Sequence, residues 1–185
     1  MLSFIERAGS ELGALEAQVV TIYREAFSCA PYFKGDAELD EFVAALHEHM
    51  QRAGFRMVAA EAGMSGTLVG FAYGYTSLPD QWWQLSVRPA LSAEDAARWL
   101  DDSFQLVEIA VPPEYQGRGI GNRLHDVLLR GLPHCCAVLS TLSAETPAMR
   151  MYQRRGWVTL LEPHYFPDIL RPYAILGLDL AARRD

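Results

Sequence analysis

Long apolar runs are absent from this chain of 185 residues. A helix that crosses a bilayer needs roughly 18 or more continuous apolar residues, and no stretch approaches that length. The first residues, Met1 to Arg7, also lack the charged start, apolar middle and cleavage site of a secretory signal. We therefore expect a cytoplasmic protein with no membrane partner.

Cysteine is scarce, with three residues, and no metal-ligand spacing accompanies it. Cys135 and Cys136 are neighbours that do not readily bridge each other, and Cys29 stands alone. The five histidines show no ligand spacing either, so we expect them at the surface or in helix caps. The sequence predicts buried, unreactive cysteines and no metal site.

Basic residues are fewer than acidic ones, 16 against 23, which gives a formal net charge of −7. Sequence-independent binding to nucleic acid needs a basic surface, so a nucleic-acid partner is not expected. The acidic balance favours a small cationic substrate or a basic peptide. A role in solubility alone is the alternative explanation of this charge.

A glycine-rich turn is the most informative feature that is present. Residues 116–121 read Gln-Gly-Arg-Gly-Ile-Gly, between an apolar run at 106–111 and an amphipathic run at 122–130. Glycine permits positive φ and close approach of a ligand. The first N–H groups of a helix have no partner inside the helix, and the helix dipole favours an anion there. A strand, this turn and a helix start therefore predict a phosphate cradle.

Two common phosphate-binding motifs are excluded. The Gly-Lys-Ser/Thr ending of a Walker loop is missing. The dinucleotide fingerprint would need Gly-x-Gly-x-x-Gly and an acidic residue about twenty positions later, but the chain reads Ser140-Thr141-Leu142-Ser143 there. The spacing that is present is Gln-x-x-Gly-x-Gly, carried by Gln116, Gly119 and Gly121.

This spacing resembles the signature of the GNAT N-acetyltransferases, Gln/Arg-x-x-Gly-x-Gly/Ala after the fourth strand. A second segment, Ala148 to Trp157, is similar to that family's Ala-x-x-x-Tyr-x-x-x-Gly-Phe, with Trp157 in place of the usual Phe. Close resemblance covers residues 104–160. It implies an α/β (α+β) fold, in which helices flank both faces of a mixed, mostly antiparallel sheet. That sheet has six to seven strands and is splayed between the fourth and fifth.

We expect one domain over residues 1–185, in four segments. Residues 1–77 hold N-terminal strands and helices. The predicted helix caps of the chain are Ser10, Asp36, Ser92 and Thr146. Residues 78–103 form an insertion, residues 104–160 the cofactor-binding core, and residues 161–185 the C-terminal strands. In the strand over 67–75, one face carries the aromatic side chains of Phe71, Tyr73 and Tyr75. The other face carries only Gly70, Ala72 and Gly74, where either a ligand or a tightly packed helix fits.

The insertion is longer than the short turn usual in the family, and it contains three tryptophans, which argue against disorder. We interpret it as a lid or wall over the acceptor site, with Trp82, Trp83 and Tyr75 as acceptor contacts. A homodimer interface is the other role open to its aromatic residues.

The resemblance implies acetyl-coenzyme A as cofactor. Backbone groups of Ile109 to Val111 would pair with pantetheine, and amides of the glycine-rich turn would face the pyrophosphate. Many members have an asparagine where this chain has Glu145, so Glu145 and Thr146 share that contact. The predicted cofactor-binding residues are Ile109, Ala110, Val111, Gln116, Gly117, Arg118, Gly119, Ile120, Gly121, Asn122, Glu145, Thr146 and Tyr152.

Acetyl transfer from a thioester to an amine needs a neutral amine and a proton for the leaving thiolate. Tyr152 matches the family tyrosine that protonates the thiolate, although a packing role on the helix face is the alternative. Glu108 is the candidate base or cation contact, with Glu61 a lesser candidate, and an ion-paired structural carboxylate is the alternative. The acceptor would be a small-molecule or peptide amine. A non-catalytic acyl-coenzyme A-binding module is the rival function.

Overall fold

The computed structural model describes residues 2–7, 9–63, 66–167 and 169–183. Its strands are β1 (Leu2–Arg7), β2 (Arg56–Ala62), β3 (Thr67–Ser77), β4 (Ser103–Ala110), β5 (Cys136–Leu142), β6 (Val158–His164) and β7 (Tyr173–Asp179). Its α-helices are α1 (Glu16–Phe27), α2 (Asp36–His49), α3 (Trp82–Val87), α4 (Ala93–Leu100), α5 (Ile120–Leu129) and α6 (Pro147–Arg154). Short 3-10 helices lie at Gly9–Ala14, Arg88–Ala90, Pro113–Tyr115 and Ala181–Arg183.

The strands form one mixed sheet in the order β1-β2-β3-β4-β5-β7-β6. The pairs β1/β2, β2/β3, β5/β7 and β6/β7 are antiparallel. Strands β4 and β5 are parallel and pair only through the first residues of β4, Ser103–Gln105, with Cys136–Val138. The predicted mixed, mostly antiparallel sheet with a split between the fourth and fifth strands is confirmed.

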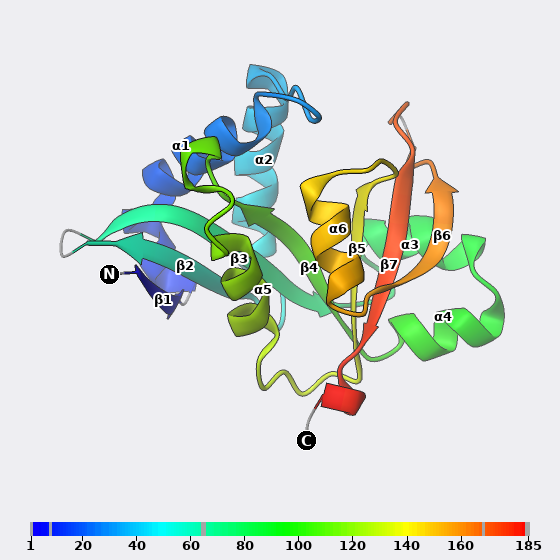
Figure 1. Ribbon diagram of the computed structural model, residues 1–185. Coiled ribbons are helices and arrows are strands. Elements are labelled where there is room, and N and C mark those ends of the chain that lie inside the picture. Colours follow the sequence, from blue (N-terminus) through cyan, green and yellow to red (C-terminus); the bar gives the residue numbers. More distant parts are fainter. Residues whose placement is uncertain (1, 8, 64–65, 168, 184–185) are drawn as a thin grey trace. The chain divides into compact units, whose positions relative to one another are not determined.

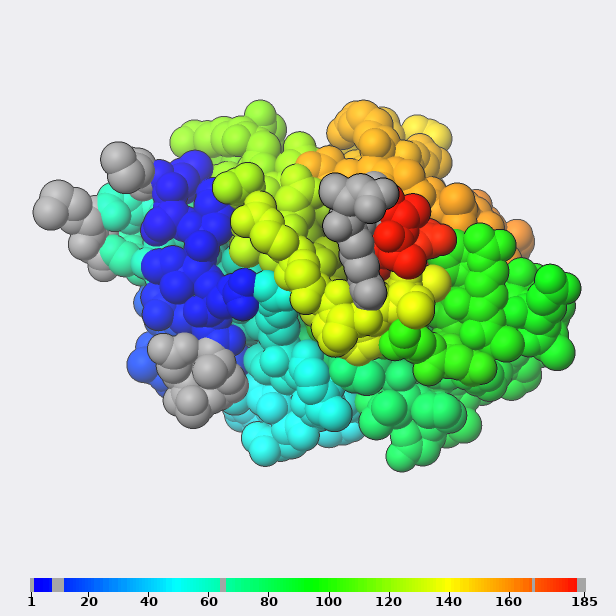
Figure 2. Space-filling model, turned by 90° about the horizontal axis from the view of Figure 1, so that it is seen from below, coloured from blue at the N-terminus to red at the C-terminus, as the bar shows by residue number. Residues whose placement is uncertain are grey.

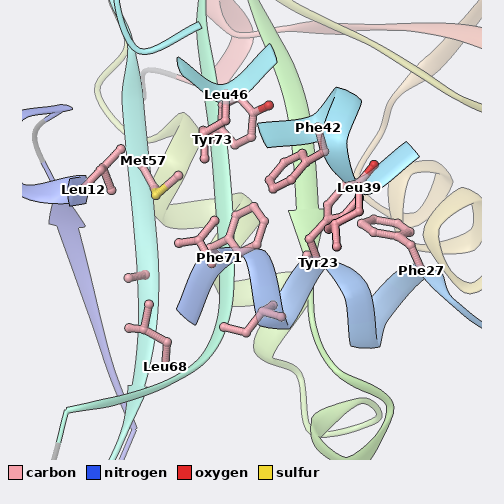
Figure 3. Packing of buried hydrophobic residues seen from close by; sticks show 14 residues of the cluster. Leu12, Tyr23, Phe27, Leu39, Phe42, Leu46, Met57, Leu68, Phe71 and Tyr73 are labelled. Atoms are coloured by element: carbon pink, nitrogen blue, oxygen red, sulfur yellow. The ribbon is translucent and has the colours of Figure 1, made fainter. Parts of the chain in front are cut away.

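Contacts divide the chain into two compact units, residues 1–75 with 107–130 and residues 76–106 with 131–185. In the first unit, α1 and α2 cover one face of β2 and β3 (Figure 3). Phe71 and Tyr73 point from β3 toward these helices, and Tyr23 stacks on Phe42 with ring centroids 3.7 Å apart. At the edge of this unit, β1 lies at the surface (blue in Figure 2).

Helix α5 lies against the opposite face of β3. A Cβ atom at Gly70 would come within 3.1 Å of the Ala110 carbonyl oxygen and 3.2 Å of Leu124 Cδ1. Contacts this close leave no space for a ligand beside Gly70. Of the two occupants predicted for this small-residue face, the structure therefore has the packed helix.

In the second unit, α3 and α4 pack around a separate core (Figure 1). Trp83 and Trp99 are both buried there. Trp99 lies so close to β7 that a Cβ at Gly177 would be 2.7 Å from its ring. The insertion is thus an ordered helical segment with apolar contacts of its own, as its tryptophans predicted.

Helix ends follow the sequence signals in two cases and differ in two. Ser92 accepts the Asp95 N–H at 3.0 Å and Thr146 accepts the Met149 N–H at 3.0 Å, so both predicted caps are confirmed. Ser10 falls instead in the 3-10 helix Gly9–Ala14, and α1 starts at Glu16. Asp36 is the first residue of α2, whose cap is Gly35.

The expectations for three histidines and two cysteines were wrong. His125, His134 and His164 are buried rather than superficial. For His125 the reason is that α5 is buried over a wide arc that includes Leu124 and Leu128. Among the cysteines, Cys29 and Cys135 are exposed and only Cys136 is buried.

Within the described ranges, no helix combines the length and apolar character needed to cross a membrane.

Candidate active site

The glycine-rich turn lies between the end of β4 and the start of α5, as predicted. Gly117 and Gly119 have φ values of 73° and 78°, in the left-handed region that favours glycine. A Cβ at either position would meet no atom within 4 Å. The backbone conformation, rather than crowding, therefore requires glycine here, and it leaves open space in front of the turn.

The helix start is available to an anion. Gly119 is the N-cap of α5, and no side chain in the described part of the chain caps this end. Residues Gln116 to Gly119 are exposed. Since the first N–H groups of an α-helix lack intrahelical partners, they point outward with the positive end of the helix dipole. This arrangement fits a phosphate group.

Two motif side chains hold the turn in place. Gln116 Nε2 donates to the Val111 carbonyl at 2.8 Å, which ties the turn to the residue after β4. Arg118 donates to the Glu114 carbonyl at 2.9 Å and lies over the Tyr115 ring, 5.5 Å from its centroid. The guanidinium of Arg118 is nevertheless exposed, so its charge adds to the positive character of the turn.

Glu108 lies on β4, close in sequence to the turn, with 20% of its side chain exposed. Burial raises the pKa of this carboxyl group above its ordinary value, and the positive charge of Lys34 partly opposes that rise. Lys34 Nζ lies 4.0 Å from Glu108 Oε1. A half-buried carboxylate with a raised pKa is a suitable general base near neutral pH.

The cation beside Glu108 is enclosed by aromatic rings. Lys34 Nζ is 4.7 Å from the ring centroids of both Tyr23 and Phe27, and it donates a hydrogen bond to the Tyr23 hydroxyl. These residues line a pocket of about 210 Å³ between the end of α1 and the start of α2. Sequence reasoning missed this group because Lys34 belongs to a loop with no periodic pattern. The signal available was that the chain contains no other lysine.

The lesser base candidate, Glu61, is engaged elsewhere. It forms an ion pair with Arg7, and only 12% of its side chain is exposed. This pair joins the neighbouring strands β1 and β2. Of the two carboxylates singled out in the sequence, Glu108 is the one that lies beside an ammonium group, that of Lys34.

Tyr75, a predicted acceptor contact, is buried in the first unit. Its hydroxyl accepts from Arg52, whose guanidinium also lies 4.6 Å from the Tyr75 ring centroid. Burial raises the pKa of Tyr75 to about 12. Next to it, His49 Nδ1 lies 3.2 Å from the Tyr73 hydroxyl, and burial lowers the pKa of His49 to about 4. Tyr75 contact with an acceptor stays a prediction.

The second unit holds the remaining predicted site residues. Tyr152 is 6% exposed and its ring packs at 63° to that of Trp157. Trp82 is 51% exposed and stacks on Phe166, whereas Trp83 is buried with its Nε1 3.4 Å from Ser140 Oγ. Of the tryptophan pair, Trp82 therefore has the ring that a ligand can reach.

The residue that replaces the family asparagine, Glu145, points to solvent. Its side chain is 85% exposed, and its carboxylate lies 3.8 Å from Arg150 Nη1. The neighbouring Thr146 is buried and caps α6. Their contact with a pantetheine chain stays a prediction.

Comparison with known proteins identifies the family of this chain. The sequence model of the acetyltransferase (GNAT) family matches residues 18–157. The chain belongs to the GNAT acetyltransferase family. A GCN5-like protein acetyltransferase of Mycobacterium tuberculosis is 32% identical, over 72% of this chain and 78% of the relative.

Solved structures share the fold at lower identity. NAA60 of Arabidopsis thaliana in complex with acetyl-CoA aligns with a TM-score of 0.63 at 17% identity, over 97% of this chain and 99% of that one. The PaiA N-acetyltransferase of Thermoplasma acidophilum in complex with coenzyme A gives 0.59 at 12% identity, with 97% and 99% coverage.

Proposed function

We propose that this GNAT acetyltransferase moves an acetyl group from acetyl-coenzyme A to a primary amine, by direct attack of the amine on the thioester. The observation that carries the proposal is the Gln-x-x-Gly-x-Gly turn at the start of α5, with Gly117 and Gly119 in left-handed conformations and open space before them. The relatives solved with acetyl-CoA or coenzyme A support the same cofactor.

The residues present fit the cofactor's chemistry. A pyrophosphate carries negative charge, and the start of α5 offers outward N–H groups with the exposed cation of Arg118 beside them. Backbone groups of Ile109 to Val111 are assigned to pantetheine, with Thr146 and Glu145 as further contacts. When bound, the cofactor supplies an activated acyl group as a thioester, and the protein's task is to bind, orient and move protons.

Glu108 is assigned to the acceptor. In its ionised form it attracts an alkylammonium group and takes a proton from it, which leaves the neutral amine that can attack. Its raised pKa makes it a stronger base than an exposed carboxylate. Tyr152 is assigned to the leaving thiolate, because a phenol with an ordinary pKa near 10 is protonated at neutral pH and can donate.

The acceptor that best suits these residues is a cationic primary amine. The chain's own lysine ammonium lies near two aromatic rings and the Glu108 carboxylate in the first unit, and rings and carboxylates are the groups that recognise alkylammonium ligands. The name of the mycobacterial relative, a protein acetyltransferase, supports an amine of a peptide or protein as one such acceptor.

A panel experiment tests the proposal. Acetyl-coenzyme A is offered with polyamines, aminoglycosides, amino acids or lysine-containing peptides, and thiol release is measured. Release that depends on an amine supports the proposal. Tight coenzyme A binding without release for any class would favour the rival, a binding-only module.

A further inference from the structure

Lys34 is the only lysine of the chain. Of the 16 basic residues, the others are all arginine. An arginine guanidinium is always protonated and is not a nucleophile at neutral pH. Apart from the N-terminal amine, Lys34 Nζ is therefore the one primary amine in the sequence, and it lies beside the carboxylate assigned as base, 4.0 Å from Glu108 Oε1.

The loop that carries Lys34 is built to hold it there. The Lys34 N–H donates to the Phe27 carbonyl at 2.9 Å, which closes the loop onto the end of α1. The preceding residue, Phe33, has φ 52°, a left-handed conformation that is unfavourable for a bulky side chain. The Phe33 N–H donates to the Cys29 carbonyl at 3.0 Å. A strained residue fixed by backbone bonds on both sides indicates a defined position for Lys34.

The surroundings of Nζ are those of a bound substrate ammonium. Aromatic faces attract a cation at distances below about 6 Å, and Tyr23 and Phe27 each lie 4.7 Å away. Only 30% of the Lys34 side chain is exposed. An amine held this way has little freedom to lose before reaction, which is the main advantage of an intramolecular nucleophile.

We propose that Lys34 Nζ is itself an acetyl acceptor, so that the protein acetylates its own lysine within one chain. This modification site rests on the proposed function, because the acetyl donor is the same acetyl-coenzyme A.

The Lys34 ammonium gives one proton to the Glu108 carboxylate, and the neutral amine forms a C–N bond to the thioester carbonyl carbon. The C–S bond breaks, and the second proton that the nitrogen loses as it becomes an amide is transferred to the leaving thiolate, which departs as coenzyme A thiol. Glu108 then returns its proton to solvent. The products are one acetyl-lysine, one free thiol and one released proton.

The modification would change the site. Acetylation removes the positive charge that lowers the pKa of Glu108, and it replaces an ammonium between Tyr23 and Phe27 by a neutral amide. An external cationic amine would then meet an unpaired Glu108 carboxylate. Lys34 therefore competes with external acceptors before modification and ceases to do so afterwards.

The test is mass spectrometry of the full chain incubated with acetyl-coenzyme A, with peptide mapping. We expect one acetyl group on Lys34, added at a first-order rate that does not depend on protein concentration. The Lys34→Arg variant keeps the charge and should gain none at this position. Glu108→Gln should slow the reaction about 100-fold or more, the usual contribution of a general base.

A second reagent separates this reaction from ordinary chemical acetylation. Succinimidyl acetate acetylates lysine without coenzyme A and needs no base from the protein. In Glu108→Gln we expect labelling of Lys34 by this reagent to be as fast as in the unmodified protein or faster, opposite to the effect with acetyl-coenzyme A. If Glu108→Gln has the same effect with both donors, Lys34 is not an enzymatic acceptor.

Parallel measurements distinguish failure of this inference from failure of the proposed function. An unmodified Lys34 in a protein that binds coenzyme A and acetylates an external amine would overturn the inference alone. A rate that rises with protein concentration would also overturn it, since the reaction would be between chains. Absence of coenzyme A binding by calorimetry would overturn both.

Discussion

Replacement of Gly119 by aspartate tests the phosphate cradle through charge alone, because asparagine provides a matched control of nearly the same size. A Cβ at this position meets no atom within 4 Å, so neither side chain should disturb packing. The φ of 78° strains both residues alike, and Asn and Asp are the side chains that tolerate this region best. The difference between the two variants therefore isolates the negative charge.

The magnitude follows from Coulomb's law. A carboxylate about 5 Å from one phosphate charge is repelled by about 0.8 kcal/mol at the dielectric constant of water and about 3 kcal/mol at an effective value of about 20. The turn is exposed, so the lower part of that range applies. We expect Gly119→Asp to bind coenzyme A about 5- to 30-fold more weakly than Gly119→Asn.

Isothermal calorimetry at two salt concentrations measures this difference. It should shrink at high salt, because exposed charges are screened over roughly 10 Å at 0.1 M ionic strength. Equal affinities of the Asp and Asn variants at low salt would refute the assignment of the pyrophosphate to this helix start.

Three further predictions concern catalysis and stability. Tyr152→Phe keeps the ring packed on Trp157 but should lower kcat about 10- to 100-fold with coenzyme A affinity unchanged; unaltered kcat in steady-state assays would make Tyr152 a packing residue. Lys34→Met removes the positive charge that lowers the pKa of Glu108, and the pKa of Glu108 should therefore rise. As the pH is lowered, the Glu108 carboxylate is then protonated at a higher pH than in the unmodified protein. The acid limb of the pH profile of kcat/KM for an external amine should then move to higher pH. Lys34→Arg keeps the charge and should leave this limb in place. If the acid limbs of the two variants coincide, Glu108 is not the base. Gly177→Ala places a Cβ 2.7 Å from Trp99 and should destabilise the fold by about 1–3 kcal/mol in chemical denaturation. Gly13→Ala, where a Cβ has no neighbour within 4 Å, is its control, and equal stability of the two variants would contradict the packing described for β7.

The parts of the fold and site that the sequence predicted are those set by local chemistry. The caps at Ser92 and Thr146 depend on a hydroxyl three residues before an N–H group, a relation visible in the chain itself. The turn at Gly117 and Gly119 follows from left-handed backbone conformations that glycine alone adopts readily. Alternation of Phe71, Tyr73 and Tyr75 predicted one aromatic face of β3, and all three side chains are buried.

The parts that it did not predict depend on contacts between distant segments. Nothing near Lys34 in the sequence indicates that Glu108 will lie 4.0 Å from it, because the loop and β4 meet only in the folded unit. Trp82 and Trp83 are indistinguishable in sequence, yet one is exposed and the other belongs to the second core. Helical periodicity places His125 on the side of α5 that is expected to be exposed. Helix α5 is buried over a wider arc than that, so His125 is buried as well.

The measurement that tests the central claim most directly is thiol release from acetyl-coenzyme A in the presence of single amines, compared between the unmodified protein and Glu108→Gln. We predict release that requires a cationic primary amine, saturates with it and falls about 100-fold or more in the variant. Release that is independent of any amine, or unchanged by loss of the Glu108 carboxylate, would contradict the account.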